Sequence, residues 1–245
     1  SLANAKGYTV VYDNNTTRAF SNGLNTASDI TISISNTSSG NSTADGWNLV
    51  GNPFPSPFGA SGFISDNTAI DGTLYFWDDD GSTGSGYSTA DYASYNSLGG
   101  TAATGGGQQS TPNGTIAIGQ AFFIKKTATG TSTLTFKNSY RTHSTSSQFY
   151  GKGPEPVQKF KFSVTGPENI YNEILLGFTP QATRGQDRLF DGTKLKGNPN
   201  LAFYSINHQN DYAIQGLPSL DGRAETIPLG IDVGRGGDYT FKTVY

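Results

Sequence analysis

The chain has 245 residues, a net charge of −3 and a pI of about 5.3. Only 14% of the residues are charged, but 13 Tyr, 15 Phe and 2 Trp are too many aromatic residues for a disordered tail. The sequence has no basic patch, no continuous apolar run of about 18 residues and no cysteine. These absences argue against nucleic-acid binding, a membrane span and disulfide or thiolate chemistry.

Apolar and polar residues alternate in short runs that turn residues separate, and helical periodicity is nearly absent. A first series of expected strands covers residues 7–12, 29–35, 47–51, 73–77, 120–126 and 132–137. A second series covers residues 157–164, 172–178, 201–206, 212–217, 226–233 and 238–245. The pattern predicts an all-β chain made of two tandem antiparallel β-sandwich modules of jelly-roll type.

The stretch 143–156 mixes Ser, Gly, Lys and Pro and separates the two series, so it reads as a linker or an irregular crossing strand. We therefore expect a first module over residues 1–150 and a second over residues 151–245. The first module contains a long Gly/Ser/Thr-rich loop at 78–114. A loop of this length is often functional, and the alternative is an elaboration with short strands around Tyr92 and Tyr95.

A strand with one buried face is expected to end abruptly in the sequence WNLVGNPFPSPF, which begins at Trp47. Proline cannot donate to a strand ladder, and it pushes the preceding residue towards extended geometry. The stretch should therefore form a stiff structural turn that carries Phe54 and Phe58 back across the sandwich. The residues expected to build this turn are Trp47, Asn52, Pro53, Pro55 and Pro57.

Aromatic residues near the long loop suggest a carbohydrate platform, because aromatic faces with polar rims suit sugar rings. Tyr75 and Trp77 share one face of the expected strand 73–77, and tyrosines of the loop are placed to join them. The alternative is that both faces of this strand are buried in the sandwich. The candidate carbohydrate residues are Tyr75, Trp77, Tyr87, Tyr92 and Tyr95.

Three consecutive carboxylates, Asp78, Asp79 and Asp80, form the strongest local charge. Calcium would relieve their repulsion, but the spacing departs from a calcium-loop pattern, so a solvated turn is the alternative. The two histidines are far apart, and no nucleophile, phosphate-loop or zinc motif occurs. No catalytic residues are predicted, and the chain is expected not to be an enzyme.

Several motifs together resemble the tandem modules that precede the C-terminal sorting domain in large proteins exported by the type IX secretion system of Bacteroidota. They include GWNLVGNPFPSPF (46–58), GTLYFWDDD (72–80) and the strands of 116–143 in the first half. DRLFDGTKLKG (187–197) and GDYTF (237–241) resemble the companion module in the second half. The resemblance implies an extracellular or cell-surface location, contact with secretion machinery or surface components, and no catalytic residues.

Three functions remain open at this stage. The first is a non-catalytic structural, presentation or adhesion unit of a large exported surface protein. The second is a carbohydrate-binding accessory module of a secreted polysaccharide-degrading enzyme. The third is the tail of a larger secreted effector.

The C-terminal stretch predicts an open sheet edge. Residues 238–244 alternate like a half-buried strand, and the chain stops at Tyr245, where the companion module of the resemblance continues through more strands. We therefore expect the second sandwich to be incomplete. Its edge at 238–244 should be available to pair with another chain or segment.

Overall fold

The structure is a computed structural model that describes residues 3–9, 23, 28–38, 45–78, 92–104, 111–142 and 157–244. Within these residues the elements are β-strands apart from one short α-helix and two 3-10 turns, which confirms the all-β class. The chain forms two compact units that interleave in sequence. The first unit comprises Ser1–Ile70 and Thr115–Gln148, and the second comprises Asp71–Gly114 and Phe149–Tyr245.

This division differs from the expected modules 1–150 and 151–245, because residues 71–114 group with the C-terminal strands. The reason is their packing. Leu98, which follows this segment's second strand, is buried in a cluster with Leu175 and Ile214 of the C-terminal half. The expected linker at 143–156 lies outside the described residues.

The first unit contains three antiparallel strand pairs around an aromatic core. β1 (Ile30–Asn36) pairs with β9 (Gly130–Phe136), β2 (Trp47–Gly51) with β8 (Ala121–Lys125), and β3 (Phe58–Gly59) with β7 (Thr115–Ile116). Along β8 the buried residues alternate with half-buried ones, as expected for a strand with one core face. The buried phenylalanines of this core are Phe54, Phe58, Phe63, Phe122 and Phe136.

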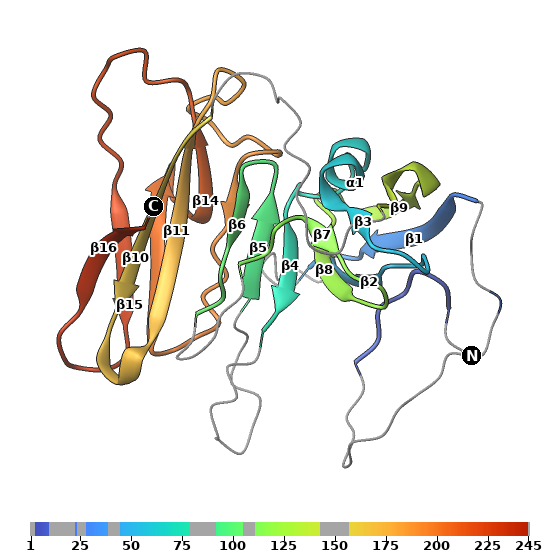
Figure 1. The fold of residues 1–245 in the computed structure, drawn as a ribbon, viewed down its shortest axis with the longest axis horizontal. Helices are drawn as coiled ribbons and strands as arrows, with labels where there is room; N and C mark the ends of the chain where they lie inside the picture. The colour runs from blue at the N-terminus through green and yellow to red at the C-terminus, as the bar shows by residue number, and fades with distance from the viewer. Residues whose placement is uncertain are drawn as a thin grey trace. The chain divides into compact units, whose positions relative to one another are not determined.

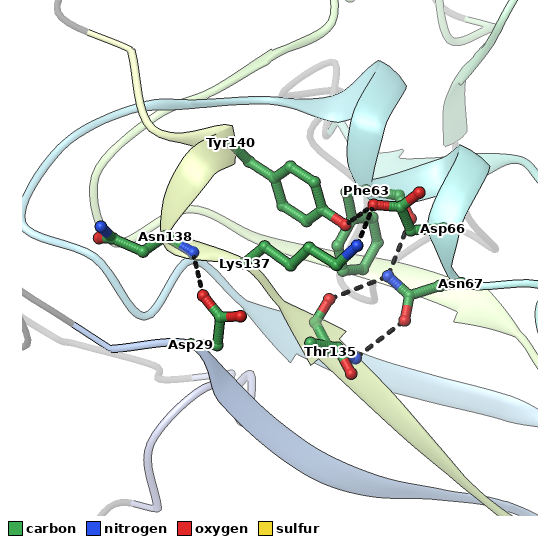
Figure 2. Close-up of polar contacts among 8 residues, drawn as sticks. All are labelled: Asp29, Phe63, Asp66, Asn67, Thr135, Lys137, Asn138 and Tyr140. Atoms are coloured by element: carbon green, nitrogen blue, oxygen red, sulfur yellow. Dashed lines mark hydrogen bonds and ion pairs between the residues drawn. The ribbon is translucent and has the colours of Figure 1, made fainter.

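Helix α1 (Ala60–Asp66) covers part of this core and was not predicted from the sequence. It buries Phe63, and the Asn67 side chain joins its C-terminal end to β9 (Figure 2). The Asn67 amide donates to the carbonyls of Phe63 (2.8 Å) and Thr135 (2.9 Å), and its oxygen accepts the Thr135 N–H (2.8 Å). These bonds satisfy a helix end that would otherwise leave carbonyls without partners.

Asp66, the last residue of α1, anchors the helix to the 3-10 turn η1 (Asn138–Tyr140). Lys137 Nζ and the Tyr140 hydroxyl both point at the same Asp66 oxygen (Figure 2). The two distances are 2.7 Å and 2.5 Å. The hydrogen bonds from Lys137 and Tyr140 lower the pKa of Asp66. On the other side of η1, the Asn138 N–H donates to Asp29 (2.7 Å). These polar contacts therefore hold α1, η1 and the residue that precedes β1 together.

The proline-rich stretch after β2 forms the turn that the sequence predicts. No strand occurs between Gly51 and Phe58, and the described chain has no cis peptide bond. Phe54 and Phe58 are buried and meet edge-on with ring centroids 6.4 Å apart. Arg141 lies over the Phe54 ring at 5.8 Å and donates to the Ser56 hydroxyl at 2.8 Å.

The Asn52 side chain closes this turn. Its amide donates to the carbonyls of Ser56 (2.9 Å), Ala117 (3.0 Å) and Ile116 (3.3 Å), and its oxygen accepts the Phe54 N–H (2.9 Å). An Asn side chain that accepts the N–H two residues further on forms an Asx-turn, which is one reason why Asn is common in turns. Trp47, Pro53 and Pro55 around it are half-buried and Pro57 is buried.

Replacing Asn52 with aspartate is expected to destabilise the chain by about 2 kcal/mol. The carboxylate keeps the acceptor for the Phe54 N–H, but its second oxygen faces the carbonyl oxygens of Ser56, Ile116 and Ala117, which lose the amide donor that they share and are repelled instead. Urea unfolding followed by tyrosine and tryptophan fluorescence measures the loss. The Asn52→Ala variant is the control, and a cost no greater for aspartate than for alanine would contradict this account.

The second unit contains a curled sheet and three short strands that pair in the order β4-β5-β6. The three short strands are β4 (Leu74–Trp77), β5 (Tyr92–Asn96) and β6 (Gly99–Thr101). A fourth short strand, β12 (Gly192–Thr193), belongs to the curled sheet. The strands of the sheet are β10 (Gln158–Thr165), β11 (Tyr171–Phe178), β13 (Leu201–Asn207), β14 (Asn210–Leu217), β15 (Leu229–Val233) and β16 (Thr240–Val244). The 3-10 turn η2 (Pro167–Asn169) joins β10 to β11.

These strands follow the order β15-β13-β14-β11-β10-β16, with β12 paired to β14. Figure 1 draws this part of the chain in yellow to red. The rings of Phe203 on β13 and Phe241 on β16 are 5.7 Å apart, although three strands lie between β13 and β16 in the sheet order. The sheet must therefore curl, so that its concave side forms a core. The buried members of this core are Val164, Ile174, Leu176, Leu201 and Phe203.

Three features depart from the sequence expectations. β11 and β14 pair in parallel, whereas only antiparallel pairing was expected. The long loop 78–114 contains β5 and β6, so it follows the alternative of an elaboration with short strands. Residues 7–9 of the expected strand 7–12 are not in a strand, and residues 10–12 lie outside the described residues.

Candidate functional site

Two of the candidate carbohydrate residues form a pair at the end of the β4–β5 hairpin that the connecting segment 78–91 joins. Trp77 and Tyr92 lie directly opposite each other in the antiparallel register, so their side chains share one face of the sheet. The Trp77 side chain is 47% exposed, and Tyr92 is half-buried. Among the described residues of the predicted platform, only Trp77 and Tyr92 lie together on one face without being fully buried.

The other tyrosines do not join this pair. Tyr75 is fully buried, and its hydroxyl donates to Asp71 at 2.8 Å, so the prediction that it contacts a sugar is wrong. Burial, and then the nearby Asp71, raises the pKa of Tyr75 well above its usual value. Tyr95 pairs with Leu74 on the opposite face, and its hydroxyl occupies the space that Gly114 leaves by having no side chain. Tyr87 lies outside the described residues.

The predicted calcium ligands are only partly visible. Asp78 follows the end of β4, whereas Asp79 and Asp80 lie outside the described residues. Within the described part of the chain, no group of three or more His, Asp or Glu side chains is placed to hold a metal ion. Calcium binding at this triplet therefore stays a prediction.

One buried carboxylate of the second unit, Glu173, has the chemistry of a candidate acid or base. Glu173 on β11 is 4% exposed, and its carboxylate accepts from Lys161 Nζ (2.7 Å), the Tyr171 hydroxyl (2.7 Å) and the Ala102 N–H (2.9 Å). Burial alone raises the pKa of Glu173, but these hydrogen bonds and the charge of Lys161 outweigh it, so the pKa is lowered. The group is therefore a charged anchor that holds the segment after β6 against β11.

Two further carboxylates, Asp187 and Asp191, shape the loop that precedes β12. Asp191 accepts the N–H groups of Asp187 (2.6 Å) and Gly216 (2.8 Å), while Asp187 accepts the N–H of Thr183 (2.5 Å). Burial raises the pKa of Asp191 to about 6, against the two backbone hydrogen bonds that lower it. The hydrogen bonds of Asp187 and Asp191 therefore organise this loop.

This shift predicts a pH dependence of stability. A folded-state pKa above the unfolded value means that the folded state binds the proton more tightly, so the contribution is complete below pH about 4 and is lost as the pH rises through about 6. The loss approaches about 3 kcal/mol for a shift of about two units. Urea unfolding from pH 4 to pH 8 should show the wild type falling relative to Asp191→Asn, which cannot ionise. Parallel pH profiles for the two proteins would contradict this prediction.

The least usual surface of the described chain is the concave side of the curled sheet, near its two outer strands. Five of the eight exposed large apolar side chains among the described residues lie there, and we call them the open face. They are Phe160 (39% exposed), Leu229 (45%), Ile231 (36%), Val233 (50%) and Phe241 (57%).

The strand registers place these side chains on one side of the sheet. Phe160 lies opposite Leu176, Ile231 opposite Phe203, and Phe241 opposite Val164, and these three partners all belong to the buried core of the concave side. The open face is thus an uncovered continuation of the core. Monomeric proteins rarely leave such patches exposed unless something binds them.

The expected edge at the C-terminal strand is present. Among the described strands β16 pairs with β10 alone, so residues 240–244 are bonded on one side only. Alternation along 238–245 predicted this edge, but it did not predict the equivalent edge at β15. The stretch TIPLGIDV reads as an ordinary core strand, and only the sheet order shows that β15 is also a terminal strand.

No helix in the described part of the chain has the length and apolar character that crossing a membrane requires. A family model described as a domain of unknown function, DUF8693, matches residues 1–244. The comparisons with curated proteins and with solved structures find no match.

Proposed function

Because the chain belongs to the DUF8693 family, whose description assigns no function, we propose a role from its surfaces: a non-catalytic presentation or adhesion unit of an exported cell-surface protein. The observation that carries this proposal is the open face. It extends over several strands and is bordered by two strands, β15 and β16, that each pair on one side only among the described strands, which suits a protein chain better than a small molecule.

The buried carboxylates support the non-catalytic part of the proposal. A general acid or base needs a free position next to a substrate. Four donors surround the Glu173 carboxylate: Lys161 Nζ, the hydroxyls of Tyr171 and Thr111, and the Ala102 N–H. Asp191 accepts from two backbone N–H groups. Both carboxylates therefore act in holding loops.

The resemblance to modules of type IX secretion substrates supports export to the cell surface or the medium. The polar surface, with 14% charged residues and no cysteine, is compatible with that location.

Two measurements test this proposal. Antibody labelling of intact source cells, with and without external protease, should detect the chain on the outside and show its removal by the protease. A panel of glycan, peptide and ester substrates should show no turnover by the purified chain. An intracellular location, or turnover that one carboxylate substitution abolishes, would overturn the proposal.

The Trp77–Tyr92 pair favours carbohydrate binding as a second candidate function. An exposed tryptophan opposite a tyrosine offers two rings on one face to a sugar. If this function is correct, a glycan array should reveal a ligand whose affinity falls about tenfold or more in Trp77→Ala. Tyr8→Ala is the matched control, because Tyr8 is a similarly exposed ring (42%) in the first unit. Absence of any glycan ligand, or equal loss in both variants, would remove this candidate.

A further inference from the structure

The outer strand β15 has its unpaired backbone groups and its exposed apolar side chains on the same residues. It pairs with β13, in the register Leu201↔Val233 to Ser205↔Leu229, and with no other described strand. The same register continues in two flanking bonds, from the Gly234 N–H to the Asn200 carbonyl and from the Ile206 N–H to the Pro228 carbonyl.

These flanking bonds determine which way each peptide group points. In an antiparallel pair, hydrogen-bonded residue pairs alternate with non-bonded pairs. Because positions 228 and 234 bond to the partner strand, the even-numbered residues of β15 face β13. The N–H and C=O groups of Leu229, Ile231 and Val233 therefore point outwards, along the free edge of the sheet.

The opposite face of β15 is firmly held. The Tyr204 ring lies over Gly230 so closely that a Cβ there would be 2.2 Å from the ring. The Tyr204 hydroxyl donates to Asp232 (2.9 Å), and Lys196 Nζ lies 2.8 Å from Asp232 and 3.8 Å from the centre of the Tyr204 ring. Strand β15 is thus a rigid edge that presents an apolar row rather than a frayed end.

The sequence of this strand, LGIDV, is self-complementary when it is paired with itself in antiparallel orientation. With Ile231 opposite Ile231 of a second copy, Leu229 faces Val233, Val233 faces Leu229, and Gly230 faces Asp232. The three odd-numbered pairs are the ones whose backbone groups point outwards, so each pair can exchange two hydrogen bonds. No like charges meet, because Asp232 lies opposite a glycine and is already paired with Lys196.

We propose that β15 is a homodimerisation edge, at which a second copy of this chain adds its own β15 antiparallel about a two-fold axis at Ile231. The pairing joins the two sheets through their edges and covers the Leu229, Ile231 and Val233 part of the open face. The arrangement is closed, because each copy offers the same edge to the other. The inference does not depend on the proposed surface location.

The other outer strand is less suited to this role. When β16 pairs with itself over all five residues 240–244, Lys242 lies opposite Lys242 of the second copy. Like charges directly opposite each other destabilise a strand pair. Pairing of β15 with β16 of another copy would leave one edge of each sheet free and would grow into open chains rather than a dimer.

Sedimentation analysis of the complete chain from micromolar to millimolar concentration tests the proposal. We expect a reversible monomer–dimer equilibrium, and we expect Ile231→Lys to weaken the dimer at least about tenfold by placing two charges opposite each other. Phe241→Lys, at the similarly exposed edge of β16, should leave the dimer unchanged. A monomer at all concentrations, larger open assemblies, or a dimer sensitive to Phe241→Lys but not to Ile231→Lys would overturn the proposal.

Single-cysteine crosslinking is a second readout that does not depend on a destabilising charge. The chain has no cysteine, so each introduced thiol is unique. Hydrogen-bonded pairs in antiparallel strands have Cα atoms about 5.5 Å apart, which suits a disulfide. Oxidation should convert Ile231→Cys into a covalent dimer at low protein concentration, and Phe241→Cys should stay monomeric. Equal crosslinking of the two variants, or none for Ile231→Cys, would contradict the two-fold axis at Ile231.

Discussion

Replacing Glu173 with alanine is expected to lower the free energy of unfolding of the second unit by about 3 to 5 kcal/mol, because it leaves Lys161 without its partner in a largely buried position. The Ala102 N–H and the Tyr171 hydroxyl lose their acceptor at the same time. Burial, and then its bond to Glu173, raises the pKa of Tyr171, so this hydroxyl remains a donor throughout the usual pH range. Urea unfolding at pH 7, monitored by circular dichroism, measures the effect.

A double-mutant cycle identifies the cause of this loss. Glu173→Gln keeps two polar positions but removes the charge, and it should cost less than Glu173→Ala. Combining Glu173→Ala with Lys161→Met removes both charges, so the double variant should be more stable than the sum of the single effects predicts. A cost below about 1 kcal/mol for Glu173→Ala, or strict additivity in the cycle, would show that the carboxylate does not hold this region together.

Most of the strands could be predicted because alternation is a local property of the sequence. The runs around Phe122 and Leu134 alternate cleanly, and both are strands in the first unit. The proline turn was also predictable, because Pro53, Pro55 and Pro57 restrict the backbone whatever surrounds them. Its detailed bonding through Asn52 was not, since the carbonyl of Ile116 reaches it from a distant part of the chain.

Helix α1 and the division into units could not be predicted in the same way. The helix is seven residues long and has no side-chain cap, so the sequence carries no start or stop signal for it. The placement of Leu98 with Leu175 and Ile214 depends on long-range packing. The parallel pairing of β11 with β14 has the same origin, because a strand's sequence does not specify its neighbour.

The candidate sites could also be predicted only in part from the sequence. The periodicity placed Tyr75 and Trp77 on one face correctly, but it could not show that the first would be buried and the second exposed. The edge at β16 followed from alternation near the end of the sequence. The edge at β15 depends on the strand order of the whole sheet, so only the structure reveals that Ile231 belongs to an outer strand.

The core of the first unit depends on one aromatic side chain of helix α1. Phe63 is fully buried, and its ring centroid lies 4.9 Å from that of Phe136 and 5.7 Å from those of Phe58 and Phe122. The contact with Phe122 is edge-on, at an interplanar angle of 89°. Aromatic pairs of this kind add to the free energy of apolar burial, so Phe63 should contribute more than an isolated core residue.

We therefore expect Phe63→Ala to lower the free energy of unfolding of the first unit by about 3 to 5 kcal/mol, through lost burial and a cavity that the surrounding rings fill only in part. Phe63→Leu retains most of the volume and should cost about 1 to 2 kcal/mol. Phe123→Ala is the matched control, because Phe123 follows Phe122 on β8 but lies on its half-buried face. Urea unfolding with the fluorescence of Trp47, which also lies in this unit, reports the transition. A loss for Phe63→Ala no larger than that for Phe123→Ala would mean that helix α1 does not complete the aromatic core.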